Sequence, residues 1–220
     1  MSAPHQLSPR RIERPSTVDL LAGDLRREIL DGVLPAGARL RERELQETYG
    51  VARHSLRAAL RALAADGLIR LEPHRGARVA RLTAEEVRWL YELRAALELE
   101  AAHLALERHG GTLPAAVHAA LADLQHACTA PDPAWSEMNE AHARLHGAIV
   151  EASESPRIVA AHAGLSGELR LFLLQLQPHL PADRLAADHA ALVAGLERDG
   201  PDVLREHLRA AADALAEHER

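Results

Sequence analysis

The feature that most constrains the fold is an arginine-bearing helix followed by a hairpin, predicted for residues 50–79. Its arginines recur at the spacing of about one helical turn, at Arg53, Arg57 and Arg61. The leucines of this helix lie on another face and can pack inward, at Leu56, Leu60 and Leu63. A helix with one buried stripe and one exposed row of arginines suits the DNA major groove, because guanidinium groups bind guanine edges and phosphates.

The segments on either side of this helix complete an ordered set of elements. The sequence predicts helices over 16–31, 42–49 and 53–66, a turn over 34–40, and strands over 68–72 and 77–81. Leu21, Leu25 and Ile29 give the first helix its apolar repeat, and Gly67 ends the third helix. Three helices followed by a hairpin predict a winged helix-turn-helix over residues 16–82.

The net charge of −6 is unevenly distributed along the chain. Residues 1–82 carry 15 arginines against 10 acidic residues, a net +5, whereas residues 83–220 carry 11 against 22, a net −11. A basic part joined to an acidic part indicates that only the first meets a polyanion. Within the basic part, residues 1–15 contain three prolines and no apolar repeat, so a disordered arm is predicted there.

Composition excludes several classes of protein. A hydrophobic content of 47% excludes a disordered chain. The sequence has no run of about 18 apolar residues and no signal-peptide pattern, which predicts a cytoplasmic protein that does not enter a membrane. Cys128 is the single cysteine, so neither a disulfide framework nor a cysteine-based metal motif is available.

Residues 83–220 are predicted to form an all-helical bundle. Thr83 and Glu86 make a capping box that opens a long helix, and further helices are predicted over 114–128, 136–153, 156–177, 183–198 and 201–218. The buried stripe of the long helix is predicted to consist of Val87, Leu90, Tyr91, Arg94, Leu97, Ala101 and Leu104. A buried guanidinium group is costly unless it is paired, so Arg94 requires either an internal carboxylate or a bound anion.

Four histidines fall on apolar faces of these helices, at His142, His146, His189 and His207. A lone histidine on such a face is usually a core residue whose ring nitrogens form hydrogen bonds within the protein, and that interpretation stays open here. Histidines at i and i+4 that face others across a bundle can instead chelate one ion, which makes this group a candidate metal site. His162 shares an apolar stripe and is a candidate to line the same pocket.

The segment LRREILDGVLPAGARLRERELQETYGV, the helix positions described above, and the segments DGLI and RGARV follow one another without a gap. Together they resemble the DNA-binding domain of the GntR family of bacterial regulators. The resemblance implies DNA contacts from Arg43, Arg53, Arg57, His74, Arg75 and Gly76. Ala52 stands where the family usually has a capping Ser or Thr, and His54 and Ser55 replace the usual next residues, which predicts a different base preference at these two positions. For Arg43, a surface ion pair with Glu47 stays open as the alternative.

The segments ELRAALELEAAHLAL, LHGAIVEASESP and DHAALVAGL resemble the FCD domain of the FadR-like GntR subfamily. That domain is a helical bundle that binds small carboxylates, often through a divalent metal held by an Asp, a His four residues later and two further histidines. His142 takes the Asp position, His146 and His189 match, and Ala211 takes the last position. His207 lies one turn earlier. It can take the place of the missing fourth ligand only if its helix shifts by a turn or if the preceding loop turns its side chain toward the site. The resemblance also pairs Arg94 with the effector's carboxylate.

These patterns predict a homodimeric transcription regulator, a repressor, whose affinity for a palindromic operator is controlled by a small organic acid. Dimerisation is expected because one recognition helix covers only a half-site. The imidazoles favour Zn²⁺ or Ni²⁺, although a metal-free pocket stays open. A metal-responsive regulator and a helical metalloenzyme are the alternatives, but the sequence has no HExxH motif and no nucleophile elbow.

Overall fold

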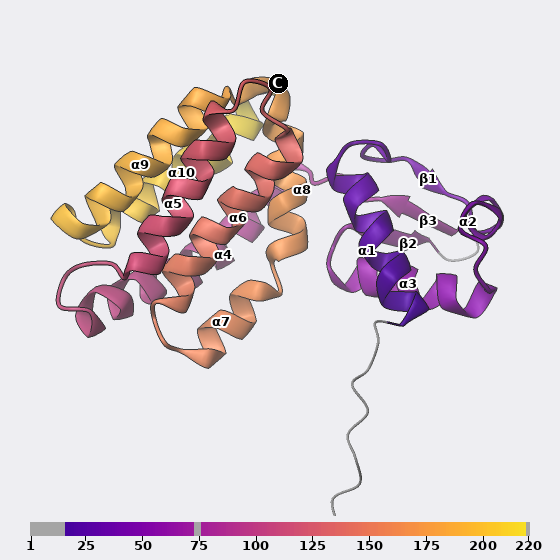
Figure 1. Cartoon of the computed structure of the whole chain (residues 1–220), viewed down its shortest axis with the longest axis horizontal. Coiled ribbons are helices and arrows are strands. Elements are labelled where there is room, and N and C mark those ends of the chain that lie inside the picture. Colours follow the sequence, from indigo (N-terminus) through magenta and orange to yellow (C-terminus); the bar gives the residue numbers. More distant parts are fainter. Residues whose placement is uncertain (1–15, 73–75, 219–220) are drawn as a thin grey trace, which may run out of the picture.

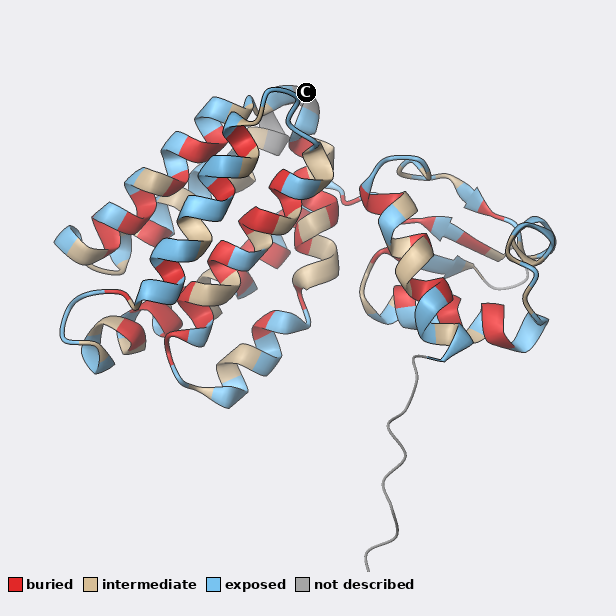
Figure 2. Ribbon diagram, viewed as in Figure 1, coloured by how far each residue is buried: buried red, intermediate tan, exposed pale blue. Residues whose placement is uncertain are grey.

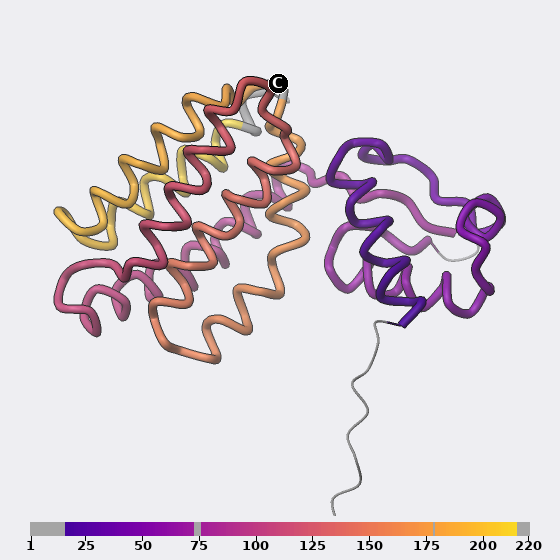
Figure 3. The backbone as a smooth tube through the Cα atoms, in the orientation of Figure 1, coloured from indigo at the N-terminus to yellow at the C-terminus, as the bar shows by residue number. Residues whose placement is uncertain are grey.

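The chain forms two lobes joined by one short connection (Figure 1, Figure 3). The computed structural model describes residues 16–72 and 76–218, without the side chains of residues 178 and 215–218. The arm predicted over 1–15 and the predicted DNA contacts His74 and Arg75 lie outside the described residues. We refer to residues 16–82 as the N-terminal lobe and to residues 83–218 as the C-terminal lobe.

The N-terminal lobe has the predicted winged helix-turn-helix order. Its helices are α1 (Thr17–Leu30), α2 (Glu42–Tyr49) and α3 (Arg53–Ala65), and its strands are β1 (Arg39–Leu40), β2 (Ile69–Glu72) and β3 (Gly76–Val79). The strands form an antiparallel sheet in the order β1-β3-β2, with Leu40 opposite Ala77 and Ile69 opposite Val79. Gly50 and Gly67 adopt positive φ angles at the ends of α2 and α3, a conformation that glycine reaches without steric cost.

Strand β1 was predicted to be part of a turn, and that prediction is wrong. Two residues are too few to show an alternating pattern, so the pairing is visible only in three dimensions. Leu40 is buried in the core, which also contains Leu25, Leu56 and Leu63. Arg39, one residue earlier, is exposed on the opposite face of the strand. The additional strand therefore places an arginine beside the hairpin.

The C-terminal lobe is the predicted helical bundle, and its helices bury the faces that they turn toward one another (Figure 2). Its elements are α4 (Ala84–Arg108), α5 (Ala115–Thr129), α6 (Trp135–Glu151), α7 (Pro156–Ala163), α8 (Ser166–Leu176), the 3-10 turn η1 (Gln177–His179), α9 (Ala182–Asp199) and α10 (Asp202–His218). The capping box of Thr83 and Glu86 at the start of α4 is present. None of the helices in the described part of the chain is long and apolar enough to cross a membrane.

The single helix predicted over 156–177 is two helices, α7 and α8, followed by η1. The break falls at Gly164 and Leu165, where glycine weakens a helix interior. Leu165 and Leu169 are buried after the break, so the change in direction keeps the apolar side of α8 against the core. The apolar repeat alone could not show this break, because both halves carry apolar residues at helical spacing.

Contacts near both ends of α8 attach it to the N-terminal lobe and the connection. The Gln175 side-chain amide accepts a hydrogen bond from the Leu82 backbone N–H at 2.9 Å and donates one to the Leu82 carbonyl oxygen at 3.0 Å. At the other end of α8, Gly167 lies so close to the last turn of α3 that an added Cβ would overlap the carbonyl oxygen of Asp66. Helix α8 therefore contacts both the connection and the end of α3.

We expect Gly167→Ala to lower the thermal unfolding temperature, because the new methyl group forces α8 and the end of α3 apart at a cost of about 1–3 kcal/mol. Gly23→Ala in α1 is the matched control, because no atom lies within 4 Å of a Cβ added there. The control should be neutral or stabilising by up to about 1 kcal/mol. Equal unfolding temperatures for the two variants would contradict the close contact between α8 and α3.

Candidate functional site

The arginine face of α3 has the predicted arrangement. Arg53, Arg57 and Arg61 are exposed, whereas Leu56, Leu60 and Leu63 are at most 2% exposed. Ala52 precedes the helix without a side-chain capping bond, as its missing hydroxyl requires. The helix therefore presents guanidinium groups to solvent while its other side is fixed in the core.

A concave basic surface surrounds this face, and we call it the basic groove. Six arginines and two glutamates line it, namely Arg39, Arg41, Arg43, Arg53, Arg57, Arg61, Glu42 and Glu72. The excess of arginine gives the groove the positive potential that a phosphate backbone requires. Arg39 and Arg41 were not among the predicted DNA contacts. Their alternation with Arg43 along the sequence was the available signal.

Glu42, the first residue of α2, holds two arginines of the groove in position. The Nε of Arg57 donates to both carboxylate oxygens of Glu42 at 3.0 Å, and the Nε of Arg53 donates to one of them at 3.4 Å. These bonds do not use the terminal Nη donors, which are the groups that bind a guanine edge in pairs. Glu42 was not among the predicted site residues, because its partners lie 11 and 15 residues away in the sequence.

The other predicted DNA contacts are arranged differently. Arg43 forms the surface ion pair with Glu47 that was kept open, at 2.9 Å, and its side chain is 90% exposed. His54 is exposed beside the arginines, and Gly76 lines the groove at the start of β3. Ser55 is buried at 9% exposure, so its side chain is not presented to a ligand. The base preference expected from this position therefore has no support in the structure.

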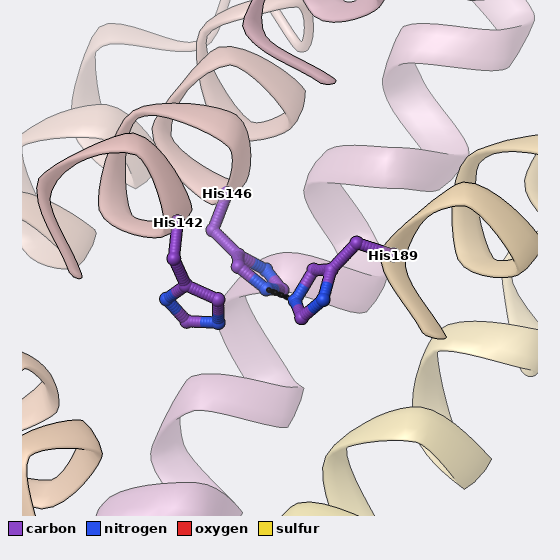
Figure 4. A group of neighbouring side chains, drawn as sticks. All are labelled: His142, His146 and His189. Carbon is purple, nitrogen blue, oxygen red and sulfur yellow. Dashed lines mark hydrogen bonds between the residues drawn. The ribbon is translucent and has the colours of Figure 1, made fainter. Parts of the chain in front are cut away.

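The second candidate site is a histidine cluster inside the C-terminal lobe (Figure 4). His142 and His146 come from α6 and His189 from α9, and all three are buried. One nitrogen from each lies within 4.8 Å of the others, which fits ligands of a common ion. The Nε2 atoms of His146 and His189 are 3.2 Å apart.

Hydrogen bonds to the second ring nitrogens determine the tautomers of two members. The Nδ1 of His146 lies 2.8 Å from the Glu98 carboxylate, and the Nδ1 of His189 lies 2.8 Å from the Leu185 carbonyl oxygen. Both partners only accept, so each Nδ1 carries the proton and each Nε2 of a neutral ring carries a lone pair. Two lone pairs that face each other at this distance repel unless a proton or a cation lies between them.

Burial disfavours a proton, compared with a metal ion, between these two nitrogens. It lowers the pKa of His142 and His189 well below the ordinary value, with the neighbouring imidazoles as the next cause. The pKa of His146 is also lowered, by burial and then by the positive charge of Arg94. The three rings are therefore neutral near pH 7, which is the protonation state that binds a metal ion. The donor set fits a divalent ion such as Zn²⁺ or Ni²⁺.

His207 joins this cluster, but less closely. Its ring centroid lies 4.6 Å from that of His189 and 5.7 Å from that of His146, and burial lowers its pKa to about 3. It is not one of the three residues whose ligand atoms group within 4.8 Å. Ala211, one turn later, lines the adjoining cavity. His207 therefore reaches the cluster from α10 even though it is one turn away from the position that the resemblance assigns to a ligand.

Arg94 has an internal partner, which decides one of the alternatives left open by the sequence. Its Nε donates to Glu98 at 2.6 Å and its Nη1 to the Tyr91 hydroxyl at 3.0 Å. Glu98 is fully buried and also accepts from His146 and from the Nε2 of His162 at 2.9 Å. Burial alone would raise the pKa of Glu98, but the charge of Arg94 holds it well below its usual range.

The predicted buried stripe of α4 missed Glu98. Leu97 and Leu104 were predicted to be buried but are only partly so, whereas Glu98, Ala102 and Ala105 are buried instead. Helical positions i+3 and i+4 lie on the same side of a helix, and the apolar pattern favoured Leu97 over a glutamate. The spacing of Arg94 and Glu98, which matches an i,i+4 ion pair, was the signal that could have identified this residue.

A cavity of about 660 Å³ opens beside the cluster, and we call it the histidine cavity. Arg94, His142, His189 and His207 line it, together with apolar residues of α8, α9 and α10. None of the hydrogen bonds that Arg94 forms within the described residues uses its Nη2. The cavity therefore combines a cationic group and neutral imidazoles with an apolar wall. His162 lines a second hollow, and Arg94, His142 and His146 also line that hollow, so His162 adjoins the cluster from its other side.

Comparison with known proteins agrees with this arrangement. Residues 17–79 match the family described as bacterial regulatory proteins, gntR family, and residues 89–216 match the FCD domain. The chain is 28% identical to a probable D-xylose utilization operon transcriptional repressor of Paenarthrobacter nicotinovorans, over 90% of this chain and 86% of that protein. It is 37% identical to the gluconate operon transcriptional repressor of Bacillus licheniformis over 40% of this chain and 35% of that protein.

Solved structures give the same result. A putative GntR transcriptional regulator from Rhodococcus sp. RHA1 superposes with a TM-score of 0.72 at 28% identity, over 90% of this chain and 97% of the other. The Escherichia coli protein McbR/YncC superposes with the same TM-score at 22% identity, over 93% and 99% of the two chains, and supports the fold. The matched family and the relatives with a printed function are transcriptional regulators and not enzymes, which argues against the metalloenzyme alternative. The chain belongs to the gntR family of bacterial regulatory proteins and is a DNA-binding transcriptional regulator with an effector-binding FCD domain.

Proposed function

We propose that this regulator is a repressor, that it binds a palindromic operator as a homodimer, and that a small carboxylate in the histidine cavity controls its affinity for DNA. Two relatives that carry printed functions are repressors, which supports the sign of regulation. The observation that carries the proposal is the basic groove on one lobe together with a buried arginine beside a cavity in the other. We also propose that residues 16–82 and residues 83–220 are separate functional units, one binding DNA and the other binding the effector, and that the protein is cytoplasmic.

The DNA contacts that we propose come from Arg53, Arg57, His54 and Arg43, with Arg39 and Arg41 on the phosphate backbone. Glu42 holds the Nε atoms of Arg53 and Arg57, so their terminal donors remain available for base edges. Bonds of this kind reduce the side-chain entropy that the arginines lose on binding. Ser55 is left out because it is buried.

We expect Arg53→Ala and Arg57→Ala each to weaken specific operator binding by about 1–3 kcal/mol for each lost base contact. The operator is first identified by selection from random DNA, and affinity is then measured by fluorescence anisotropy. Arg209→Ala is the matched control, because Arg209 is exposed on α10 and pairs with Glu206 at 3.5 Å. If both groove variants bind within about twofold of the parent, α3 is not the recognition helix.

The homodimer is supported by geometry and by surface composition. One recognition helix covers only a half-site, so a palindrome requires two copies. Trp89 and Leu93 lie one turn apart on α4 and are 54% and 50% exposed. Exposed Trp and Leu side chains one turn apart form an apolar patch that a second copy of the chain can cover. We therefore propose that this face of α4 contributes to the contact between copies.

The effector site that we propose is the inner end of the histidine cavity. Arg94 lines it and keeps Nη2 outside its bonds to Glu98 and Tyr91. A guanidinium group that is buried and already oriented binds a carboxylate with little loss of side-chain entropy. The internal partner does not remove this role, because neither Glu98 nor Tyr91 uses Nη2 of Arg94, and the Glu98 carboxylate also accepts hydrogen bonds from His146 and His162.

The cofactor that we propose is a divalent metal ion, Zn²⁺ or Ni²⁺, held by His142, His146 and His189, with His207 as a further candidate. Such an ion supplies a fixed positive charge next to the effector carboxylate. Two hydrogen bonds would orient the ligands of this ion, because Glu98 orients His146 and the Leu185 carbonyl oxygen orients His189. His142 has no such bond among those found in the described residues, so its orientation depends on packing.

We expect His146→Ala and His189→Ala to abolish tight binding of Zn²⁺ and His142→Ala to weaken it less, because the first two rings are fixed by hydrogen bonds to a second partner. His118→Ala is the control, since His118 is exposed and pairs with Glu197 at the surface. Binding is measured by competition with a chelating dye.

The affinity for Zn²⁺ should also fall with acidity. Because the pKa values of these imidazoles are lowered, protons should compete with the metal only below about pH 6. Protein purified without tag or chelator that contains no metal, and that takes up neither Zn²⁺ nor Ni²⁺, would rule out the metal site.

A further inference from the structure

The polar and apolar groups of the histidine cavity are separated along its length. Arg94, His142 and His189 lie at the buried end, and all three are less than 9% exposed. Arg184 and Asp188 line the cavity and are exposed, with an ion pair of 3.5 Å between them, so they mark its mouth. Of the other polar residues that line the cavity, Tyr91 bonds to Arg94 and His207 lies against His189, whereas His179 and Asp213 are exposed. The polar groups of the cavity therefore belong either to the buried cluster or to its exposed rim.

The wall between these ends is apolar. It is formed by side chains of three helices, with Phe172, Leu173 and Leu176 from α8, Leu192 from α9, and Val203 and Ala211 from α10. None of these six side chains has a hydrogen-bonding atom. A ligand that reaches from Arg94 toward the mouth must place the middle of its body against this wall.

The chemistry of the wall selects among carboxylates. A hydroxyl group buried against it loses its bonds to water and gains none, so each buried hydroxyl weakens binding. A methylene group in the same place strengthens binding by up to about fourfold. The two effects act in the same direction, so the wall favours hydrocarbon over a polyhydroxylated chain.

We infer that the effector is a monocarboxylic acid with a hydrocarbon body, straight-chain or aromatic, and not a sugar acid. This inference rests on the proposed function, which supplies the carboxylate at Arg94, and adds the chemical class of the remainder. The acid end lies at Arg94 and the histidine cluster, and the body lies along α8 and α10. The cavity volume of about 660 Å³ accommodates a body of six or more carbons, since ligand pockets of roughly 300–1,000 Å³ hold molecules of drug size.

The test compares three six-carbon probes on the full-length, zinc-supplemented protein by isothermal titration calorimetry. Hexanoate and gluconate share a carboxylate and differ in their hydroxyl groups, whereas hexan-1-ol keeps the hydrocarbon and lacks the acid. We expect hexanoate to bind at least about tenfold more tightly than gluconate and than hexan-1-ol. Butanoate should bind more weakly than hexanoate, by up to about fourfold for each methylene removed. Phenylacetate should also bind more tightly than gluconate.

A variant of the wall gives a second measurement. Val203→Thr keeps the size of the side chain and adds a hydroxyl to the wall, so it should weaken hexanoate binding several-fold and leave the affinity for Zn²⁺ unchanged. Val203 is half-buried, so the change is milder than a substitution in the core.

The outcomes separate this inference from the proposed function. Gluconate binding as tightly as hexanoate would overturn the hydrocarbon class and leave the carboxylate site standing. Hexan-1-ol binding as tightly as hexanoate would overturn the carboxylate site and leave the apolar wall as the binding surface. No binding of any probe up to about 10 mM would overturn both.

Discussion

The C-terminal lobe depends on one buried carboxylate. Glu98 is inaccessible to solvent and accepts hydrogen bonds from Arg94, His146 and His162, which belong to α4, α6 and α7. A buried charge without partners would cost several kcal/mol, and removing one partner of a buried pair typically costs about 3–5 kcal/mol. This network therefore fixes the relative positions of three helices at the point where the histidine cluster is built.

The same carboxylate connects the two parts of the proposed effector site. Through Arg94 it orients the group that we assign to the effector, and through His146 it orients a proposed metal ligand. The cavity beside them is lined by α8, whose first turn contacts Asp66 at the end of α3 and whose Gln175 holds the connection at Leu82. Helix α8 is thus the element shared by the effector cavity and the DNA-binding lobe, and a change at one can reach the other through it.

Much of this architecture could be predicted from the sequence. The spacing of Arg53, Arg57 and Arg61, the glycines at helix ends and the capping box at Thr83 are local signals, and the structure agrees with them. The convergence of His142, His146 and His189 also followed from apolar stripes at helical spacing. The arginine spacing, the glycines and the cap depend on neighbours within a few residues, where the geometry of a helix determines which side chains share a face. The histidines of α6 and α9 lie 43 residues apart, and their grouping was predicted with the help of the resemblance to the FCD domain.

The features that were missed depend on partners far along the chain. Strand β1 exists because Leu40 pairs opposite Ala77, and the role of Glu42 appears only when α3 folds back onto α2. Glu98 was hidden because its second and third partners lie 48 and 64 residues away. A charged residue next to an apolar stripe is usually solvated, and only the folded bundle shows that three donors surround this one.

The most direct test is the affinity of Glu98→Gln for Zn²⁺, measured beside Glu100→Gln, an exposed position of the same helix. Gln keeps the shape of the side chain but removes the charge that fixes the tautomer of His146, so affinity should fall by about 10–100-fold while helical content by circular dichroism is retained. Glu100→Gln should match the parent. A folded Glu98→Gln protein that binds Zn²⁺ as tightly as the parent would contradict the central role of this carboxylate.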